Sequence, residues 1–371
     1  LGPRTAAFKK VDEPQVYDEW WGKDTGKSER VVEPYVAIEE ENGAFTCLDR
    51  SYTFNALGLP TVVISRKGDV LAGPARLVVV VDGSQTVVDV AATPTITDRK
   101  DWRVRFKGQA KGAGLAFSTE GFMAQDGMVL VDLSYGPEGK RPVKIDALRL
   151  EFPVANDVAE CLSSVGPGAN FAAATNTVLP PDKPGPLWSV FDTGRAGAKM
   201  RVGSFYPHVW LGNEKRGLQW WADSDKGWIP HDEIPAHEVY RAKVSGFGVQ
   251  VSGKTEGDPD TQHLTPDTCV VLRNNIVGKP AEITAPRTLR FTWTATPFKR
   301  LPKGWRNFAA TEDGTFVQPF RSLRINPKTM KKYTNSTISW INPESEDPSQ
   351  WSRLWHENRT LGAPWEKVVD G

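Results

Sequence analysis

The 371-residue sequence contains only three cysteines, Cys47, Cys161 and Cys269, and they lie far apart. No spacing matches a CxxC or zinc-binding pattern, and a disulfide framework needs cysteines in denser pairs. We therefore expect buried free thiols, with one disulfide plus one free thiol as the alternative. The alternative would indicate an oxidising compartment.

The sequence also lacks a long apolar run and an excess of charge of one sign. Its richest apolar run, residues 77–83 (LVVVVDG), has the length of a strand, whereas a membrane span needs about 20 apolar residues. The 46 Lys and Arg against 45 Asp and Glu give a net charge of +1, with both signs mixed along the chain. We therefore predict no membrane span and no nucleic-acid partner. The first ten residues, LGPRTAAFKK, lack the apolar core of an uncleaved signal peptide.

Short strand-like segments make up most of what the sequence does contain. They are rich in Val, Ile, Thr and aromatic residues, and Gly, Pro or Asp clusters separate them at intervals of about ten residues. This spacing predicts an all-β fold with two antiparallel β-sandwich domains and a short mixed or irregular C-terminal tail. We expect an extended lead-in (1–30), a first β-sandwich (31–153), a second with an aromatic hairpin (154–300), and a linker and tail (301–371). Within the tail, residues 347–358 predict a short helix.

Two of these segments alternate large apolar residues with polar ones. In residues 102–108 (WRVRFKG) and 287–297 (RTLRFTWTATP), every second side chain is apolar, so one face of each strand is buried and the other is wet. A solvated sheet face explains the charged side chains of the wet face. The intervening residues 156–201 contain Pro181, Pro184 and Pro186, which predict loop or sheet edge.

An aromatic stretch, residues 205–228 (FYPHVWLGNEKRGLQWWADSDKGW), predicts a hairpin with two turn-like breaks. Its indole rings either fill a core or form a platform on which the apolar face of a sugar stacks. Acidic and basic side chains next to them could hydrogen-bond sugar hydroxyls. The predicted substrate-binding residues are Trp210, Trp220, Trp221, Asp223, Asp225, Lys226 and Trp228.

Residues 212–228 (GNEKRGLQWWADSDKGW) resemble the β-sandwich region of glycoside hydrolase family 123 and related uncharacterised bacterial proteins. Residues 125–154 and 291–306 resemble the flanking parts of that region in the same order. The resemblance implies a secreted, periplasmic or cell-surface bacterial protein of polysaccharide degradation. Its activity would be hydrolysis of a terminal β-linked N-acetylhexosamine, with the 2-acetamido oxygen of the substrate as internal nucleophile.

The catalytic machinery of that family is an Asp-Glu pair on a barrel domain. Such a barrel typically needs about 250 residues, and only residues 307–371 follow the resemblance, so no catalytic barrel fits in this chain. The implied partners are therefore a carbohydrate and a catalytic barrel in the same full-length protein. The tail in 301–371 would then be the start of that barrel, with a truncated end or a different C-terminal extension as the alternatives. Asp232 and Glu233 are the nearest thing to an acid/base pair here, but Pro230 and Pro235 bracket them as a solvent loop. We predict no catalytic residue in this chain, with those two carboxylates as the weak candidates.

No metal or cofactor is predicted. His231 and His237 flank the two carboxylates, but the neighbouring prolines prevent a helical i, i+4 arrangement of two ligands. Residues 223–225 (DSD) are explained by an Asx turn, since later acidic calcium ligands are missing. Two rival interpretations stay open: a non-catalytic carbohydrate-binding sandwich, which needs at least two exposed Trp rings, and a structural cell-surface protein, which predicts buried rings.

Overall fold

The structure is a computed structural model, and it describes residues 29–165, 174–192, 205–243 and 268–300. The described residues up to 299 belong to one compact unit. The predicted lead-in up to residue 28, the tail from residue 301 and the expected helix at residues 347–358 lie outside the described residues. No helix that could cross a membrane occurs in the part of the chain that is described.

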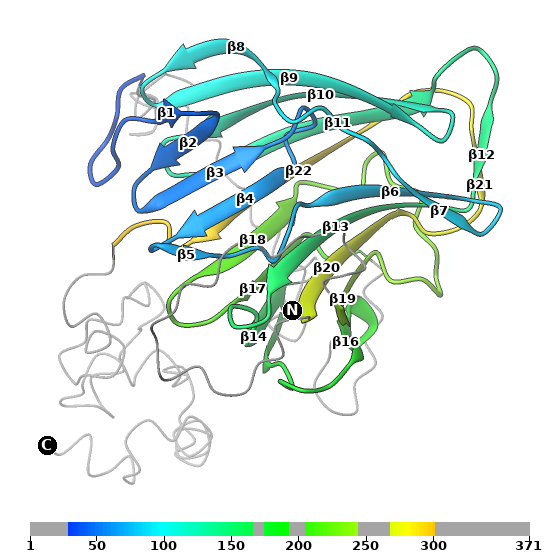
Figure 1. Ribbon diagram of the computed structural model, residues 1–371. Helices are drawn as coiled ribbons and strands as arrows, with labels where there is room; N and C mark the ends of the chain where they lie inside the picture. Colours follow the sequence, from blue (N-terminus) through cyan, green and yellow to red (C-terminus); the bar gives the residue numbers. More distant parts are fainter. Residues whose placement is uncertain (1–28, 166–173, 193–204, 244–267, 301–371) are drawn as a thin grey trace, which may run out of the picture. The chain divides into compact units, whose positions relative to one another are not determined.

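The unit is built almost entirely of antiparallel β-strands, which confirms the predicted all-β sandwich class (Figure 1). One layer is a nine-stranded sheet. In spatial order its strands are β15 (Ala174–Val178), β14 (Cys161–Val165), β17 (His208–Gly212), β18 (Gly217–Ala222), β22 (Arg287–Thr296), β11 (Val129–Pro137), β10 (Leu115–Ala124), β9 (Arg103–Gly112) and β8 (Thr95–Lys100).

Two smaller sheets form the layer in front of it in Figure 1. The six-stranded sheet has the order β16 (Gly185–Ser189), β19 (His237–Lys243), β20 (Thr268–Val277), β13 (Ala147–Ala155), β6 (Arg76–Val81) and β7 (Ser84–Val87). The five-stranded sheet has the order β1 (Glu39–Glu41), β2 (Ala44–Cys47), β3 (Arg50–Phe54), β4 (Pro60–Ser65) and β5 (Gly68–Asp69). A two-stranded ribbon of β12 (Val143–Ile145) and β21 (Ala281–Ile283) lies at one end, and η3 (Val190–Asp192) follows β16.

The core lies between the two layers and is aromatic on both sides. From β3, Tyr52 and Phe54 meet Trp293 of β22 with ring centroids 5.1 and 6.3 Å apart, and Phe54 also meets Phe106 of β9 at 4.9 Å. All four side chains are at most 1% exposed. Rings of this size each remove a large apolar area from water, so they hold the five-stranded sheet on the larger one.

The two halves of the chain are interleaved in these sheets. In the nine-stranded sheet, β22 pairs with both β11 and β18, and in the six-stranded sheet β13 pairs with β6 and β20. The boundary expected between residues 153 and 154 falls inside β13. Strands from both expected ranges therefore share one core rather than forming two separate cores.

The proline-containing region is expected to form loops or sheet edges, and the cysteines are expected to be buried free thiols. Within residues 156–201, β15 and β16 stand at sheet edges, and Pro186 of β16 therefore interrupts no central strand. The prediction of loop or sheet edge is wrong for β14, which pairs with β15 on one side and β17 on the other. All three cysteines are free thiols; Cys47 and Cys269 are buried, as predicted, whereas Cys161 is partly exposed. Burial raises the pKa of Cys47 to about 11 and that of Cys269 to about 12.

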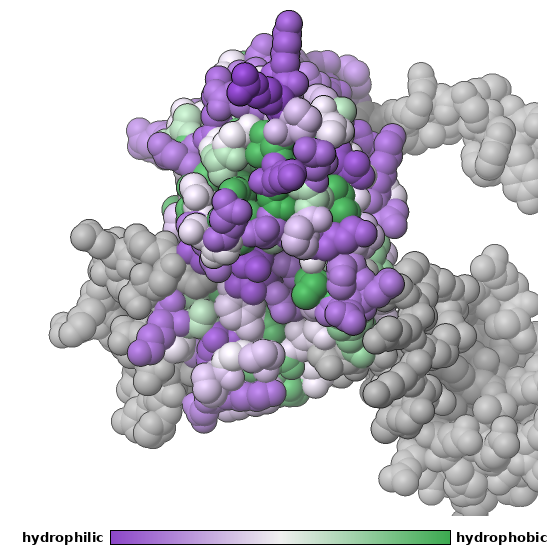
Figure 2. Space-filling view, turned by 90° about the vertical axis from the view of Figure 1, so that its right-hand side faces the viewer, coloured by the Kyte–Doolittle hydropathy of each residue, from purple (hydrophilic) through white to green (hydrophobic). Residues whose placement is uncertain are grey.

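The side of the unit that carries β12 and β21 faces the viewer in Figure 2. Apolar side chains show there in patches between hydrophilic ones. Val87 of β7 is 52% exposed and is one of the few large apolar residues of the described chain with more than half of its surface open to solvent. This side therefore has no broad, continuous apolar surface.

Candidate functional site

The outer face of the nine-stranded sheet, which points away from both smaller sheets, carries the candidate site. Side chains alternate between the two faces of a strand. Phe106, Val131 and Phe291 point into the core with at most 1% exposure, so the residues on either side of them along the strands point outward. The register of β9, β10, β11, β22 and β18 aligns these outward residues in rows that run across the strands.

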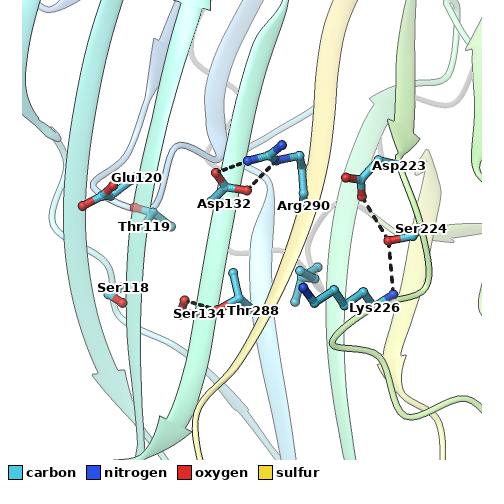
Figure 3. Close-up of a pocket in the computed structure, with 11 residues that line it drawn as sticks. Ser118, Thr119, Glu120, Asp132, Ser134, Asp223, Ser224, Lys226, Thr288 and Arg290 are labelled. Carbon is cyan, nitrogen blue, oxygen red and sulfur yellow. Dashed lines mark hydrogen bonds and ion pairs between the residues drawn. The ribbon is translucent and has the colours of Figure 1, made fainter.

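One row is charged. Lys107 of β9 stands opposite Glu120 of β10, which stands opposite Asp132 of β11, which stands opposite Arg290 of β22. Arg290 donates two hydrogen bonds, at 2.7 and 2.8 Å, to the two carboxylate oxygens of Asp132. Asp223 follows β18 directly and lies beside Arg290 (Figure 3). We call these five residues the charged row.

The neighbouring row, two residues along each strand, is largely apolar. Trp221 of β18 stands opposite Thr292 of β22, which is aligned with Leu130 of β11 and then with Phe122 of β10. The Trp221, Leu130 and Phe122 side chains are partly exposed. Arg105 ends the row on β9 and has its guanidinium 5.9 Å from the centre of the Phe122 ring. We call the four residues from Trp221 to Phe122 the apolar row.

A third row, on the other side of the charged row, bears hydroxyl groups. Thr288 and Ser134 share a hydrogen bond of 2.7 Å, and Ser118 continues the row on β10. The loop after β18 rises beside this row, and its Lys226 side chain reaches toward Thr288 (Figure 3). Hydroxyls, carboxylates and cations thus gather on one exposed sheet face.

Two open cavities lie side by side over these rows. The first, of about 500 Å³, lies over the hydroxyl and charged rows and is closed on one side by Asp223, Ser224 and Lys226. The second, of about 420 Å³, lies over the charged and apolar rows and extends to Arg105 and Thr97. Both are lined by Glu120, Asp132 and Arg290, so they form one continuous depression, which we call the sheet-face groove.

The electrostatics of the groove leave several groups free to bind a ligand. The hydrogen bonds to Asp132 raise the pKa of Arg290, so the guanidinium stays charged. The Glu120 carboxylate and the Lys226 ammonium make no side-chain hydrogen bond or ion pair with the described residues, and both side chains are exposed. The four cations Arg105, Lys107, Lys226 and Arg290 nearly balance the three carboxylates. Such a surface suits an uncharged ligand with many hydroxyl groups.

The predicted substrate-binding residues divide between this face and the core. Asp223 and Lys226 line the groove. Trp221 is partly exposed on the same outer face, beside the groove, but lines neither cavity. Trp210 also lies on this face, partly exposed, and its indole nitrogen donates to Thr296 Oγ1 at 3.0 Å. Asp225 is exposed in the loop but does not line either cavity.

Trp220 and Trp228 are core residues, and for these two the prediction of sugar contact is wrong. They are 0% and 4% exposed, and their ring centroids lie 6.2 Å apart. Both pack against the buried His237 at 4.9 and 5.3 Å. A ring enclosed in this way has no face left for a sugar. Burial of His237 lowers its pKa to about 4, and Nδ1 donates to Asn274 Oδ1 at 2.7 Å.

The weak catalytic candidates lie away from the groove. Asp232 and Glu233 are exposed in the loop before β19, and the Glu233 amide donates to His231 Nδ1 at 3.0 Å. Neither carboxylate lines a cavity described above. Among the described residues, no group of three or more His, Cys, Asp or Glu side chains could hold a metal ion.

Sequence reasoning missed Glu120, Asp132 and Thr288 as site residues. The alternation of residues 102–108 and 287–297 indicated an outward face for Arg105, Lys107 and Arg290, but it gave no reason to place these strands together. The pairing of β22 with β11 creates the Asp132–Arg290 contact across 158 positions of sequence. Register of this kind is a property of the fold rather than of any one segment.

A protein-family model decides the relationship of the chain. The model described as "Glycoside hydrolase 123, third domain" matches residues 38–226, just over half of the sequence. The chain belongs to this glycoside hydrolase 123 family. The predicted resemblance is thus confirmed, and the chain contains a glycoside hydrolase-related region. The match contains every groove residue named above except those of β22.

Other comparisons add little. No curated protein matches the chain. Solved structures that match the chain include a GalM/aldose epimerase homologue from C. elegans, with 10% identity, coverage of 71% of this chain and 98% of that one, and a TM-score of 0.35. A putative aldose 1-epimerase from Escherichia coli K12 has 7% identity, coverage of 70% and 98%, and a TM-score of 0.33. A galactose 1-epimerase from Lactobacillus acidophilus has 8% identity, with coverage of 71% of this chain and 98% of that one, and a TM-score of 0.31. Likenesses this weak carry no information on chemistry.

Proposed function

We propose that the sandwich binds a carbohydrate in the sheet-face groove and serves as the accessory region of a family 123-like glycoside hydrolase. The enzyme would act outside the cell or at its surface, on a terminal β-linked N-acetylhexosamine or a related glycan. The single observation that carries the binding proposal is the apolar row beside the charged row.

This pairing of rows matches the two-sided character of a sugar ring. The apolar CH face of a pyranose stacks on aromatic side chains, and its hydroxyls take hydrogen bonds from ionised groups. Trp221 and Phe122 supply partly exposed rings, while Arg290, Asp132 and Glu120 supply donors and acceptors two residues away along the same strands. The Asp132–Arg290 pair fixes both side chains before any ligand arrives, which reduces the entropy lost on binding.

The hydrolase part of the proposal is supported by the family match. A catalytic pair is not proposed within the described residues, because Asp232 and Glu233 stand in an exposed loop away from the groove. The sandwich would instead hold the glycan for a catalytic barrel of the same full-length protein.

Titration calorimetry of the full chain with N-acetylgalactosamine, N-acetylglucosamine, galactose and their β-linked oligomers tests the binding. We expect Trp221→Ala to weaken binding about tenfold, the factor that corresponds to about 1.4 kcal/mol. Arg290→Ala is expected to weaken it at least as much, because a charged hydrogen bond contributes about 1.5–3 kcal/mol.

Two variants outside the groove serve as matched controls. Phe298→Ala removes a ring that is 37% exposed, and Lys111→Ala breaks an exposed ion pair with Glu138 of 2.7 Å. Both should bind as the unaltered chain does. If no sugar binds, or if the control variants weaken binding as much as Trp221→Ala, the groove is not a carbohydrate site and a structural role of the sandwich takes its place.

The hydrolase proposal needs a separate measurement. The intact mass of the protein from its natural source should lie well above 41.0 kDa, and the same preparation should release sugar from a chromogenic N-acetyl-β-galactosaminide. A mass equal to this chain together with no turnover on any glycoside would refute the enzyme and leave a glycan-binding sandwich.

A further inference from the structure

The groove is longer than one sugar ring. Its lining runs from Asp223, directly after β18, across β22, β11 and β10 to Arg105 on β9, which makes four inter-strand steps. At about 4.8 Å a step, the lining spans about 19 Å. A six-membered ring with bonds of roughly 1.5 Å is only about 3 Å across. A single sugar therefore cannot fill the groove.

The charged row runs the whole length of this lining. Each of β22, β11, β10 and β9 contributes one ionisable side chain to it, and Asp223, directly after β18, ends the row opposite Lys107. Hydrogen-bonding groups thus recur at each inter-strand step next to the apolar row. A ligand with a repeating unit, apolar on one face and hydroxylated at its edge, would meet the same kind of contact at each step.

One end of the groove is closed by the loop after β18. Gly227 is held there because its carbonyl oxygen accepts hydrogen bonds from Tyr135 Oη at 2.8 Å and Arg287 Nε at 3.2 Å. Asp223 and Lys226 of this loop form the wall of the first cavity. The second cavity leads away from the wall to the exposed Arg105 and Lys107.

We infer that the groove binds an oligosaccharide of two to three consecutive sugars that lies across the strands, with one chain end against the loop wall. The end sugar occupies the first cavity, against Asp223, Ser224 and Lys226. The next sugars extend over Leu130 to Phe122 and Arg105. This inference rests on the proposed carbohydrate binding and adds the length and direction of the ligand.

Ladders of one to four β-linked units of N-acetylglucosamine, N-acetylgalactosamine, galactose and glucose, titrated into the full chain, test this length. We expect the Kd to fall with each added unit up to three and to stay constant beyond. Phe122→Ala should raise the Kd for the trisaccharide about tenfold and leave that for the monosaccharide unchanged. Lys226→Ala, which removes a side chain from the wall of the first cavity, should raise both. Phe122→Leu, which keeps an apolar side chain without a ring, separates stacking from folding defects, and Phe298→Ala controls for loss of a ring elsewhere.

The outcomes separate this inference from the function on which it rests. Absence of binding by every ladder refutes both. Binding with the same Kd for one and three units, or an equal effect of Phe122→Ala on both lengths, overturns the extended site and leaves a single-sugar site. Equal weakening by Phe122→Ala and Phe298→Ala would likewise overturn it, because the loss would then not be local to the groove.

Discussion

The loop wall of the groove depends on Gly227, and replacing this residue by alanine tests the geometry directly. The φ angle of Gly227 is +87°, a left-handed backbone conformation that is strained for alanine by about 1–2 kcal/mol. An added Cβ would lie 2.3 Å from the carbonyl oxygen of Thr288 on β22. Loop and strand would have to separate by at least about 0.7 Å to restore a contact of 3.0 Å.

The same separation would weaken the two hydrogen bonds that the Gly227 carbonyl accepts, since they already measure 2.8 and 3.2 Å. Each contributes about 0.5–1.5 kcal/mol. With the backbone strain, we expect Gly227→Ala to reduce the free energy of unfolding by about 2–5 kcal/mol in urea denaturation. Displacement of Asp223 and Lys226 should also weaken binding of the end sugar about tenfold.

Gly83→Ala is the matched control. Gly83 lies between β6 and β7 with a φ of +74°, and an added Cβ there would meet nothing within 4 Å. It should therefore lose only the strain, about 1–2 kcal/mol, and no carbohydrate affinity. Equal destabilisation by the two variants would refute the close approach of the loop to Thr288. Unchanged sugar binding by Gly227→Ala would remove the loop from the binding site.

Two further predictions concern buried ionisable groups. Glu151 is 1% exposed and accepts hydrogen bonds from Arg76 and Arg273 at 2.7 Å each. Burial raises the pKa of this carboxyl group, but the two guanidiniums have the larger effect and hold the pKa below its usual value. The stability that Glu151 contributes is present above about pH 4 and is lost as the pH falls through the lowered pKa. We expect Glu151→Ala to reduce the free energy of unfolding by about 3–5 kcal/mol in urea denaturation. The control Glu138→Ala, which breaks an exposed ion pair, should reduce it by less than about 1 kcal/mol. The pKa of His237 is lowered from 6.5 to about 4, so stability should be complete above pH 6.5 and fall by about 3 kcal/mol as the pH drops to 4, because the unfolded chain binds the proton first. His237→Phe should remove that part of the pH dependence, and an unchanged pH profile would contradict the buried neutral imidazole.

The sequence was sufficient to predict the all-β class because its strand segments alternate at the sheet period. Val104 and Phe106 are buried and Arg105 and Lys107 exposed, as the alternation in residues 102–108 indicated. The family could be predicted for a different reason. A run such as residues 212–228 combines turns, rings and charges in a fixed order, and such a run is specific enough to recognise.

Burial of individual tryptophans could not be predicted in the same way. Trp220 and Trp221 are adjacent and chemically identical, yet one is 0% exposed and the other lies on the outer face. Alternation requires that neighbours point to opposite faces, but it does not say which face is covered. The choice follows from β19, which packs His237 against Trp220 from 17 positions further along the chain.

The groove depends on the pairing of β11 with β22, two strands that lie far apart in the sequence. Glu120 and Asp132 are directly opposite each other on β10 and β11, an arrangement of like charges that destabilises a sheet unless cations flank it. Lys107 and Arg290 stand at the two ends of this pair, on β9 and β22. Replacing both carboxylates by neutral amides removes this repulsion, so the change should be neutral or favourable for stability. We therefore expect the double variant Glu120→Gln, Asp132→Asn to fold at least as stably as the unaltered chain while losing carbohydrate affinity. This separation of stability from affinity would mark the charged row as a binding feature, and a loss of both together would mark it as part of the scaffold.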